Sequence, residues 1–128
     1  MRKELWASRH DIFSLKITQM LSHLDMSICF KILQNLSHLS LTYGAKHVGM
    51  EYERSLFGMK MSDAKIFSEC LRTTTSLVTL SLPSNLIDDD LVSILIKGLM
   101  LNKTLVQLDL SHNRIGNSGA RKIAKYLL

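Results

Sequence analysis

Three residues near the C-terminus, Asp109, Ser111 and His112, have the side chains of a hydrolytic triad. A serine nucleophile needs a histidine base and an orienting carboxylate that converge on it from different elements. Here the three residues follow one another closely, and neighbours on a strand point to opposite faces of the sheet. We therefore expect Asp109 on an exposed sheet face, a turn at Ser111 and His112, and a chain that is not an enzyme.

The residues that could bind metal ions or nucleotides lack the spacing these ligands need. Asp88, Asp89 and Asp90 are consecutive, whereas calcium loops alternate their ligands and add a downstream Glu; we expect a solvated turn that caps the following helix. The five histidines are not paired at ligand spacing, and Cys29 and Cys70 belong to no metal-binding motif. We expect two buried, reduced thiols. No glycine-rich phosphate loop occurs, so we predict no metal, no cofactor and no small-molecule substrate.

The composition is that of a globular protein, with 46% hydrophobic residues among 128 and a formal net charge of +5. The positive charge is scattered and aromatic residues are few, which disfavours nucleic-acid binding. No secretory signal and no run of about 18 apolar residues is present, so we expect an intracellular protein without a membrane partner. Arg121, Lys122 and Lys125 are interpreted as a solvated helix face; the alternative is contact with an acidic partner such as tubulin.

The strongest feature of the sequence is an internal repeat. Residues 77–87 and 105–115 align without a gap at an offset of 28 (105 − 77), and both match L-x-x-L-x-L-x-x-N-x-L/I, the leucine-rich-repeat signature. The L-x-L core alternates with period two, which predicts that the leucines share one interior while the residues between them face outward. The inward residues are Leu80, Leu82, Leu108 and Leu110.

The Asn that ends each signature stands where the chain turns away from its strand. The amides of Asn85 and Asn113 can hydrogen bond backbone groups that the turn leaves unpaired. Stacked repeats would align these two residues in a structural ladder.

The return leg of each repeat has helical spacing. Val92, Leu95, Ile96 and Leu99 form one apolar face, and Ala120, Ile123, Ala124 and Leu127 form its copy at the same offset (120 − 92). Asp90 and Ser118 are the expected N-caps of these helices. Together with Asn113-x-Ile115-Gly116-x-x-Gly119-Ala120, this pattern resembles the ribonuclease-inhibitor-like subclass of leucine-rich repeats. The resemblance implies an α/β solenoid fragment with parallel strands on the concave side and helices on the convex side.

The upstream part of the chain is less regular. A third strand is expected at residues 36–41, and its repeat is longer than the others because the next copy begins at an offset of 41 (77 − 36) instead of 28. A packed insertion between Gly44 and Met61 accounts for the extra length. Six apolar residues lie within it or directly before it: Tyr43, Met50, Tyr52, Leu56, Phe57 and Met59. Ala64, Phe67 and Leu71 predict the following helix.

Residues 1–35 are interpreted as an N-terminal lead of two helices, the first carrying Phe13, Ile17, Met20, Leu21 and Leu24. The expected division is therefore 1–35 for the lead and 36–128 for the repeats, which fall at 36–76, 77–104 and 105–128.

The insertion carries a closer resemblance. The residues that carry it are 41–50, Glu53 and 56–59, together with 88–90, 94–95, 98–99 and 108–121. They resemble the dynein regulatory complex subunit 5 family, also called T-complex-associated testis-expressed protein 1. The resemblance implies a non-enzymatic structural subunit of the nexin–dynein link, located in the cytoskeleton of motile cilia and sperm flagella. It implies as partners the other subunits of that complex and axonemal components. Proteins of this family are longer, so we expect a fragment or a short isoform.

The repeat pattern also predicts the binding surface, because solenoids bind through the residues that their strands present on the concave face. Seven outward residues form the candidate protein-binding face: His38, Ser40, Thr42, Thr79, Ser81, Gln107 and Asp109. Two alternatives to an axonemal scaffold remain, another intracellular leucine-rich-repeat adaptor and a protein like the Ran GTPase activator. A ribonuclease inhibitor is disfavoured, because those are acidic and rich in Cys.

A first prediction concerns stability. Solenoids need about three stacked repeats and polar caps, and here Ile123 and Leu127 have no following repeat to cover them. We expect the isolated chain to be a marginally stable monomer, or to need a partner over residues 120–128. Thermal unfolding followed by circular dichroism checks this, and a cooperative transition of the monomer at high temperature would contradict it.

Overall fold

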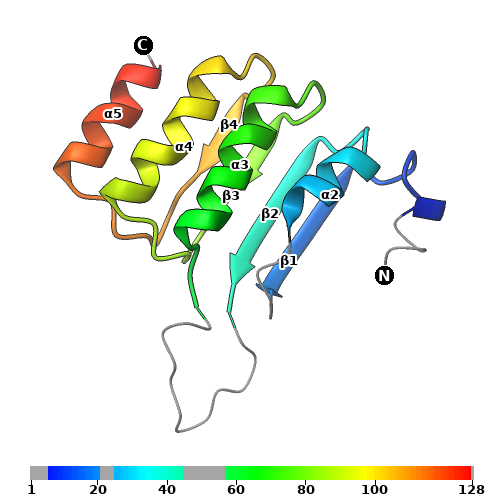
Figure 1. The fold of residues 1–128 in the computed structure, drawn as a ribbon, viewed down its shortest axis with the longest axis horizontal. Helices are drawn as coiled ribbons and strands as arrows, with labels where there is room; N and C mark the ends of the chain where they lie inside the picture. Colours follow the sequence, from blue (N-terminus) through cyan, green and yellow to red (C-terminus); the bar gives the residue numbers. More distant parts are fainter. Residues whose placement is uncertain (1–5, 21–24, 45–56, 128) are drawn as a thin grey trace, which may run out of the picture.

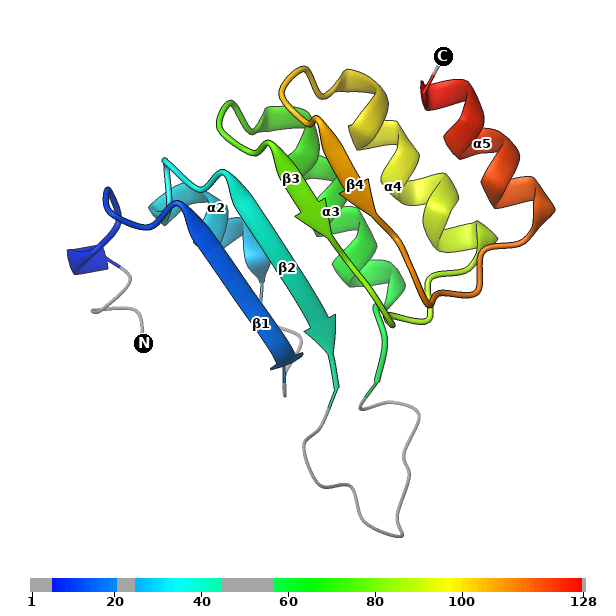
Figure 2. The same cartoon turned by 180° about the vertical axis from the view of Figure 1, so that it is seen from behind.

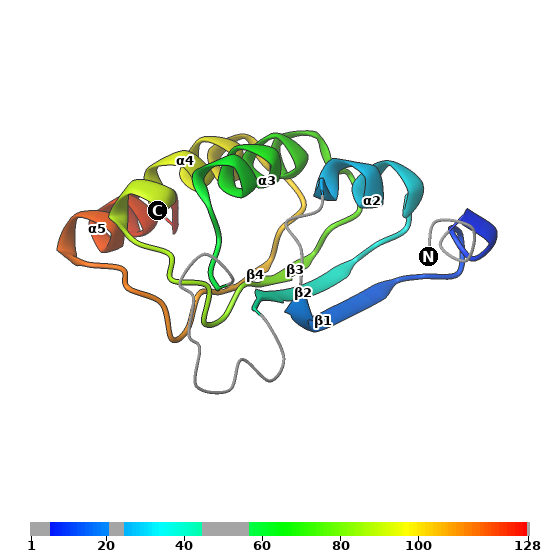
Figure 3. The ribbon, with the colours of Figure 1, turned by 60° about the horizontal axis from the view of Figure 1, so that its bottom comes forward.

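The computed structural model describes residues 6–20, 25–44 and 57–127. The strands are β1 (Ser14–Met20), β2 (His38–Tyr43), β3 (Thr79–Ser81) and β4 (Gln107–Asp109), and the helices are α2 (Met26–Ile32), α3 (Met61–Thr73), α4 (Asp89–Leu101) and α5 (Asn117–Leu127). The strands form one parallel sheet in the order β1-β2-β3-β4. All four helices cover the same face of that sheet (Figure 1; Figure 3). The predicted two-layer solenoid is confirmed.

The strand register reproduces the repeat lengths predicted from the sequence. His38 is opposite Thr79, an offset of 41 (79 − 38), and Thr79 is opposite Gln107, an offset of 28 (107 − 79). Leu80 and Leu82 are fully buried, and the half-buried Leu108 and Leu110 pack against the same hydrophobic core. The prediction that these leucines share one interior is confirmed.

The predicted helical lead is wrong in its first half. Residues 14–20 form strand β1, which pairs with β2 in parallel and places Leu15 opposite Leu39. Phe13, Ile17 and Met20 have helical spacing, but residues 14–18 also alternate with the strand period of two. Pairing with β2 favours the strand, because it supplies backbone hydrogen bonds that a short isolated helix cannot match. Leu21 and Leu24 lie outside the described residues. The second expected helix, with Cys29, Ile32, Leu33 and Leu36 on its apolar face and running up to the next strand, is present as α2 but ends at Ile32, before β2 begins at His38.

A glycine sets the close approach of α3 and α4. A Cβ atom at Gly98 would lie 2.0 Å from the carbonyl oxygen of Ser68, so no side chain fits between the two helices at this point. In the register of the regular repeat, the equivalent position of α3 is 70 (98 − 28), which is Cys70. Consequently α3 and α4 meet backbone against backbone, whereas a thiol stands on the side of α3 that faces α2.

The acidic residues at the start of α4 cap this helix and connect two repeats. The side chain of Asp88 accepts a hydrogen bond from the N–H of Leu91 (3.0 Å), so Asp88 is the N-cap of α4 and not Asp90 as predicted. The carboxylate of Asp89 accepts from the N–H of Gly116 (2.7 Å) just before α5. A negative charge from one repeat therefore stands at the positive end of the next helix. Ser118 lies inside α5 rather than at its cap.

Most of the predicted insertion, residues 45–56 with Met50, Tyr52 and Leu56, lies outside the described residues. Its two flanks meet at the end of β2. The N–H of Gly58 donates to the carbonyl of Tyr43 (3.3 Å), and the N–H of Met59 donates to the carbonyl of Asn85 (2.7 Å). Tyr43 and Met59 are both buried, so both flanks belong to the core.

The packing of α3 on α4 yields the second prediction. Gly98→Ala should lower the free energy of unfolding by about 1–3 kcal/mol, because the added methyl group must push two backbones apart. The higher helix propensity of alanine works in the opposite direction by about 1 kcal/mol. Urea unfolding measures the difference, with the exposed neighbour Lys97→Ala as the matched control. Equal stability of the two variants would show that the helices do not pack at this distance.

Candidate protein-binding face

In the described residues, one face of the sheet is free of helices, and we call it the open sheet face (Figure 2). Side chains that alternate with the buried leucines project from it. They fall into two rows of register partners, Ser14–His38–Thr79–Gln107 and Lys16–Ser40–Ser81–Asp109, with Thr42 beyond them on β2.

The structure brings all seven predicted residues together on this face. His38 and Gln107 are exposed, and the other five are half-buried between their neighbours. Every member of the two rows is polar, and most of the side chains are small. The face can therefore form hydrogen bonds and ion pairs over a shallow surface.

Sequence reasoning missed the part of this face that β1 contributes. Ser14 and Lys16 are exposed register partners of His38 and Ser40. The signal that could have found them is the alternation of polar and apolar residues from Ser14 to Thr18, which has the strand period. It extends the predicted face by one strand and adds a positive charge.

Asp109 is held in a fixed orientation. One carboxylate oxygen accepts the backbone N–H of Ser111 (2.9 Å), and the other accepts the hydroxyl of Ser81 (3.0 Å) from the neighbouring strand. The N–H of Ser111, together with the hydroxyls of Ser111 and Ser81, holds the pKa of Asp109 below its usual range. At neutral pH this residue is an oriented anion on the open sheet face.

The first Asn of the predicted ladder closes the turn between repeats. Asn85 is fully buried. Its side-chain oxygen accepts the N–H of Tyr43 (2.8 Å), and its amide nitrogen donates to the carbonyl of Leu41 (2.8 Å). Asn85 thus satisfies both a donor and an acceptor at the end of β2, in the preceding repeat.

Asn113 performs the same task one repeat later. Its side-chain oxygen accepts the N–H groups of Asn85 (2.8 Å) and Ile87 (3.0 Å), and its amide donates to the carbonyl of Leu82 (2.9 Å). The backbone of Asn85 is therefore bound by Asn113, whereas the side chain of Asn85 binds the repeat before it. These bonds connect three successive repeats.

The turns that carry these Asn residues use left-handed backbone at residues other than glycine. Ser84 has φ 54° and His112 has φ 56°, at equivalent positions of successive repeats. Such a conformation is unfavourable for these side chains, so the hydrogen bonds of the Asn ladder hold it in place. The expected turn at Ser111 and His112 is present, and the carboxylate of Asp109 is directed to the backbone of that turn.

Within the described ranges, no three His, Cys, Asp or Glu residues are grouped so that they could hold a metal ion. In the same residues, every helix is too short or too polar to cross a membrane.

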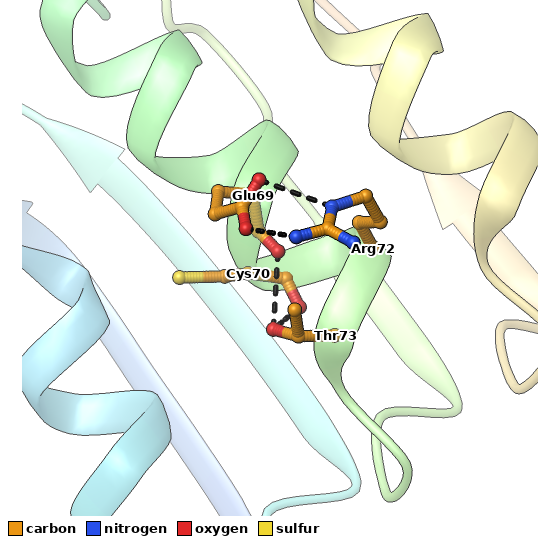
Figure 4. Close-up of polar contacts among 4 residues, drawn as sticks. All are labelled: Glu69, Cys70, Arg72 and Thr73. Atoms are coloured by element: carbon orange, nitrogen blue, oxygen red, sulfur yellow. Dashed lines mark hydrogen bonds and ion pairs between the residues drawn. The ribbon is translucent and has the colours of Figure 1, made fainter.

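A groove lies between α2 and α3 on the helical side, with a volume of about 460 Å³ and a lining that includes Phe30, Lys31 and Cys70. Cys70 points toward α2, away from the ion pair that Glu69 forms with Arg72 on the same helix (Figure 4). Cys29 and Cys70 are both free thiols; Cys70 is buried as predicted, whereas Cys29 is only half-buried. Burial raises the pKa of Cys70 to about 11.

The last repeat is less covered than those before it. Val106 is 84% exposed and Leu127 is 72% exposed, and between them a cavity of about 600 Å³ reaches Leu108, Leu110 and Ile123. The equivalent strand leucines of the preceding repeat, which β4 and α5 follow, are fully buried.

Comparison with known proteins gives two kinds of match. Residues 101–124 match the family described as Leucine Rich repeat. Over 93 residues, 72% of this chain, the sequence is 43% identical to dynein regulatory complex subunit 5 of Chlamydomonas reinhardtii. It is 39% identical to the subunit of the same name from Mus musculus and 36% identical to that from Homo sapiens, each over 73% of the chain.

The chain spans only part of the curated relatives it matches, 24% of the Chlamydomonas reinhardtii protein and 19% of the Mus musculus protein.

The ladder yields the third prediction. Asn85→Ala should lower the free energy of unfolding by about 2–4 kcal/mol, because it leaves the N–H of Tyr43 and the carbonyl of Leu41 without their partner in a buried site. Denaturant unfolding measures this. Asn117→Ala, at an exposed position, should change the stability by less than about 0.5 kcal/mol. If both variants were equally stable, the two hydrogen bonds of Asn85 would not support the turn.

Proposed function

We propose that this chain, which belongs to the family of dynein regulatory complex subunit 5, is a non-enzymatic scaffold that binds other proteins within the dynein regulatory complex. Its place would be the nexin–dynein link of motile cilia and sperm flagella, in the axonemal cytoskeleton. The single observation that carries the proposal is the identity of 43% over 93 residues to a protein of that name.

The chemistry of the open sheet face supports a scaffold. Solenoids of this type present a continuous surface that suits extended protein contacts, and here that surface is polar over four strands. The carboxylate of Asp109 is bound to Ser81 and to the backbone of Ser111. It is therefore not directed at His112 as a triad would require.

The seven predicted residues, His38, Ser40, Thr42, Thr79, Ser81, Gln107 and Asp109, are proposed as contact positions for other subunits of the complex. The Asn ladder and the leucine core have a different role, which is to keep the strands in register. A change on the open sheet face should therefore weaken binding and leave folding intact, whereas a change in the ladder should affect both.

The fourth prediction tests the function directly. A tagged copy of the chain produced in ciliated cells should be recovered with isolated axonemes and should co-purify with subunits of the dynein regulatory complex. A matched variant with two bulky side chains on the open sheet face, Ser40→Trp with Ser81→Trp, should lose co-purification. Lys97→Ala on the helical side should retain it.

Two results would contradict the proposal. Absence of every subunit of the complex from the purified material would favour another intracellular leucine-rich-repeat adaptor. Stimulation of GTP hydrolysis by a small GTPase incubated with the chain would favour the alternative of a GTPase activator.

A further inference from the structure

Two opposite charges stand at the ends of one row on the open sheet face. Lys16 on β1 is the register partner of Ser40, Ser40 is that of Ser81, and Ser81 is that of Asp109 on β4. Lys16 is exposed and Asp109 is half-buried. Since adjacent strands are about 4.8 Å apart, three steps place the two residues about 14 Å from one another.

The row between the two charges contains two small polar side chains, Ser40 on β2 and Ser81 on β3. The hydroxyl of Ser81 is already used within the chain, because it donates to Asp109 (3.0 Å). An extended polypeptide laid along this row would bring unpaired backbone groups onto it, and between the two charges only the hydroxyl of Ser40 would be left to bind them. An α-helix satisfies its own backbone groups and presents only side chains.

We propose that the open sheet face binds one α-helix of a partner protein, which lies across the strands with an acidic side chain over Lys16 and a basic side chain over Asp109. At a rise of about 1.5 Å for each position, a separation of about 14 Å corresponds to side chains nine or ten positions apart on that helix. The order of the two charges defines the direction in which the helix lies. This inference rests on the proposed scaffold function and specifies the partner chemistry of the same face.

The geometry favours a partner helix that lies in one direction along the row, whatever the net charge of that helix. Asp109 cannot turn toward a misplaced partner, because both of its oxygens are bound. Lys16 has a long side chain and can adjust. A helix in the reverse direction would place like charges together at both ends of the row, which is unfavourable.

Zero-length cross-linking with a carbodiimide tests the inference in axonemes that contain the tagged chain. The reagent joins a carboxylate and an amine that are in contact. We expect Lys16 to be linked to an Asp or Glu, and Asp109 to a Lys, of one and the same partner, nine or ten positions apart. Links to two different proteins, links about four positions apart as in an extended strand, or links to a second copy of this chain would overturn the inference.

Charge reversal provides the second arm. Lys16→Glu and Asp109→Lys should each reduce the fraction of partner retained by about fivefold, since each loses one ion pair. The double variant has the net charge of the original chain but the opposite orientation, and should stay weak. Binding of the double variant at the original level would overturn the inference, because net charge alone would then suffice.

Matched controls separate folding from binding. Lys97→Glu and Asp90→Lys reverse exposed charges away from the open sheet face and should retain the partner. Asp109→Asn removes the charge but retains an oxygen that can accept the N–H of Ser111, so it should unfold like the original chain and still bind weakly. Full binding by Asp109→Asn would contradict the proposed ion pair.

The two proposals fail in different ways. If the tagged chain is recovered with proteins that are not dynein regulatory complex subunits, the proposed function is wrong. The inference about a helical partner is then still tested by the charges and the spacing of the residues that cross-link to Lys16 and Asp109 on the protein that is bound. If subunits of the complex are recovered but charge reversal has no effect while Ser40→Trp with Ser81→Trp abolishes binding, the function stands and the inference is wrong.

Discussion

The fold depends on how the backbone groups at the ends of successive parallel strands find hydrogen-bond partners. Each strand ends at the same edge of the sheet, and the chain must turn there toward a helix while its backbone groups lose their partners. Asn85 and Asn113 solve this problem across repeats, because the amide of one repeat completes the backbone of the repeat before it. These bonds complete the backbone beside the left-handed turns and connect three successive repeats.

The same repeat position has different consequences in successive helices. At Gly98 the absence of a side chain lets α4 contact the backbone of α3. At Cys70 a thiol occupies the corresponding space between α3 and α2, beside a groove. The same position of the repeat is therefore a close backbone contact between α3 and α4 and a side-chain contact between α2 and α3.

The two faces of the sheet have separate roles. The buried face carries leucine at equivalent positions of β2, β3 and β4, and this face stabilises the fold by apolar burial. The open sheet face carries residues that differ from strand to strand, with a cation on β1, hydroxyls on β2 and β3, and a fixed anion on β4. Variation on one face with repetition on the other is what a binding scaffold needs, because the specificity can change without a change in the core.

The 28-residue period of the sequence is enough by itself to predict the two regular repeats and the role of Asn85 and Asn113. It also predicts which leucines face inward and which polar residues face outward. These features are local, since a strand period of two and a helix period of 3.6 can be read directly from spacing. The tertiary structure alone decided that residues 14–20 are a strand, because helical and strand spacing overlap there and only pairing with β2 distinguishes them. It also decided that Lys16 and Asp109 share one row, since they are far apart in the chain and the register of four strands brings them onto the same face.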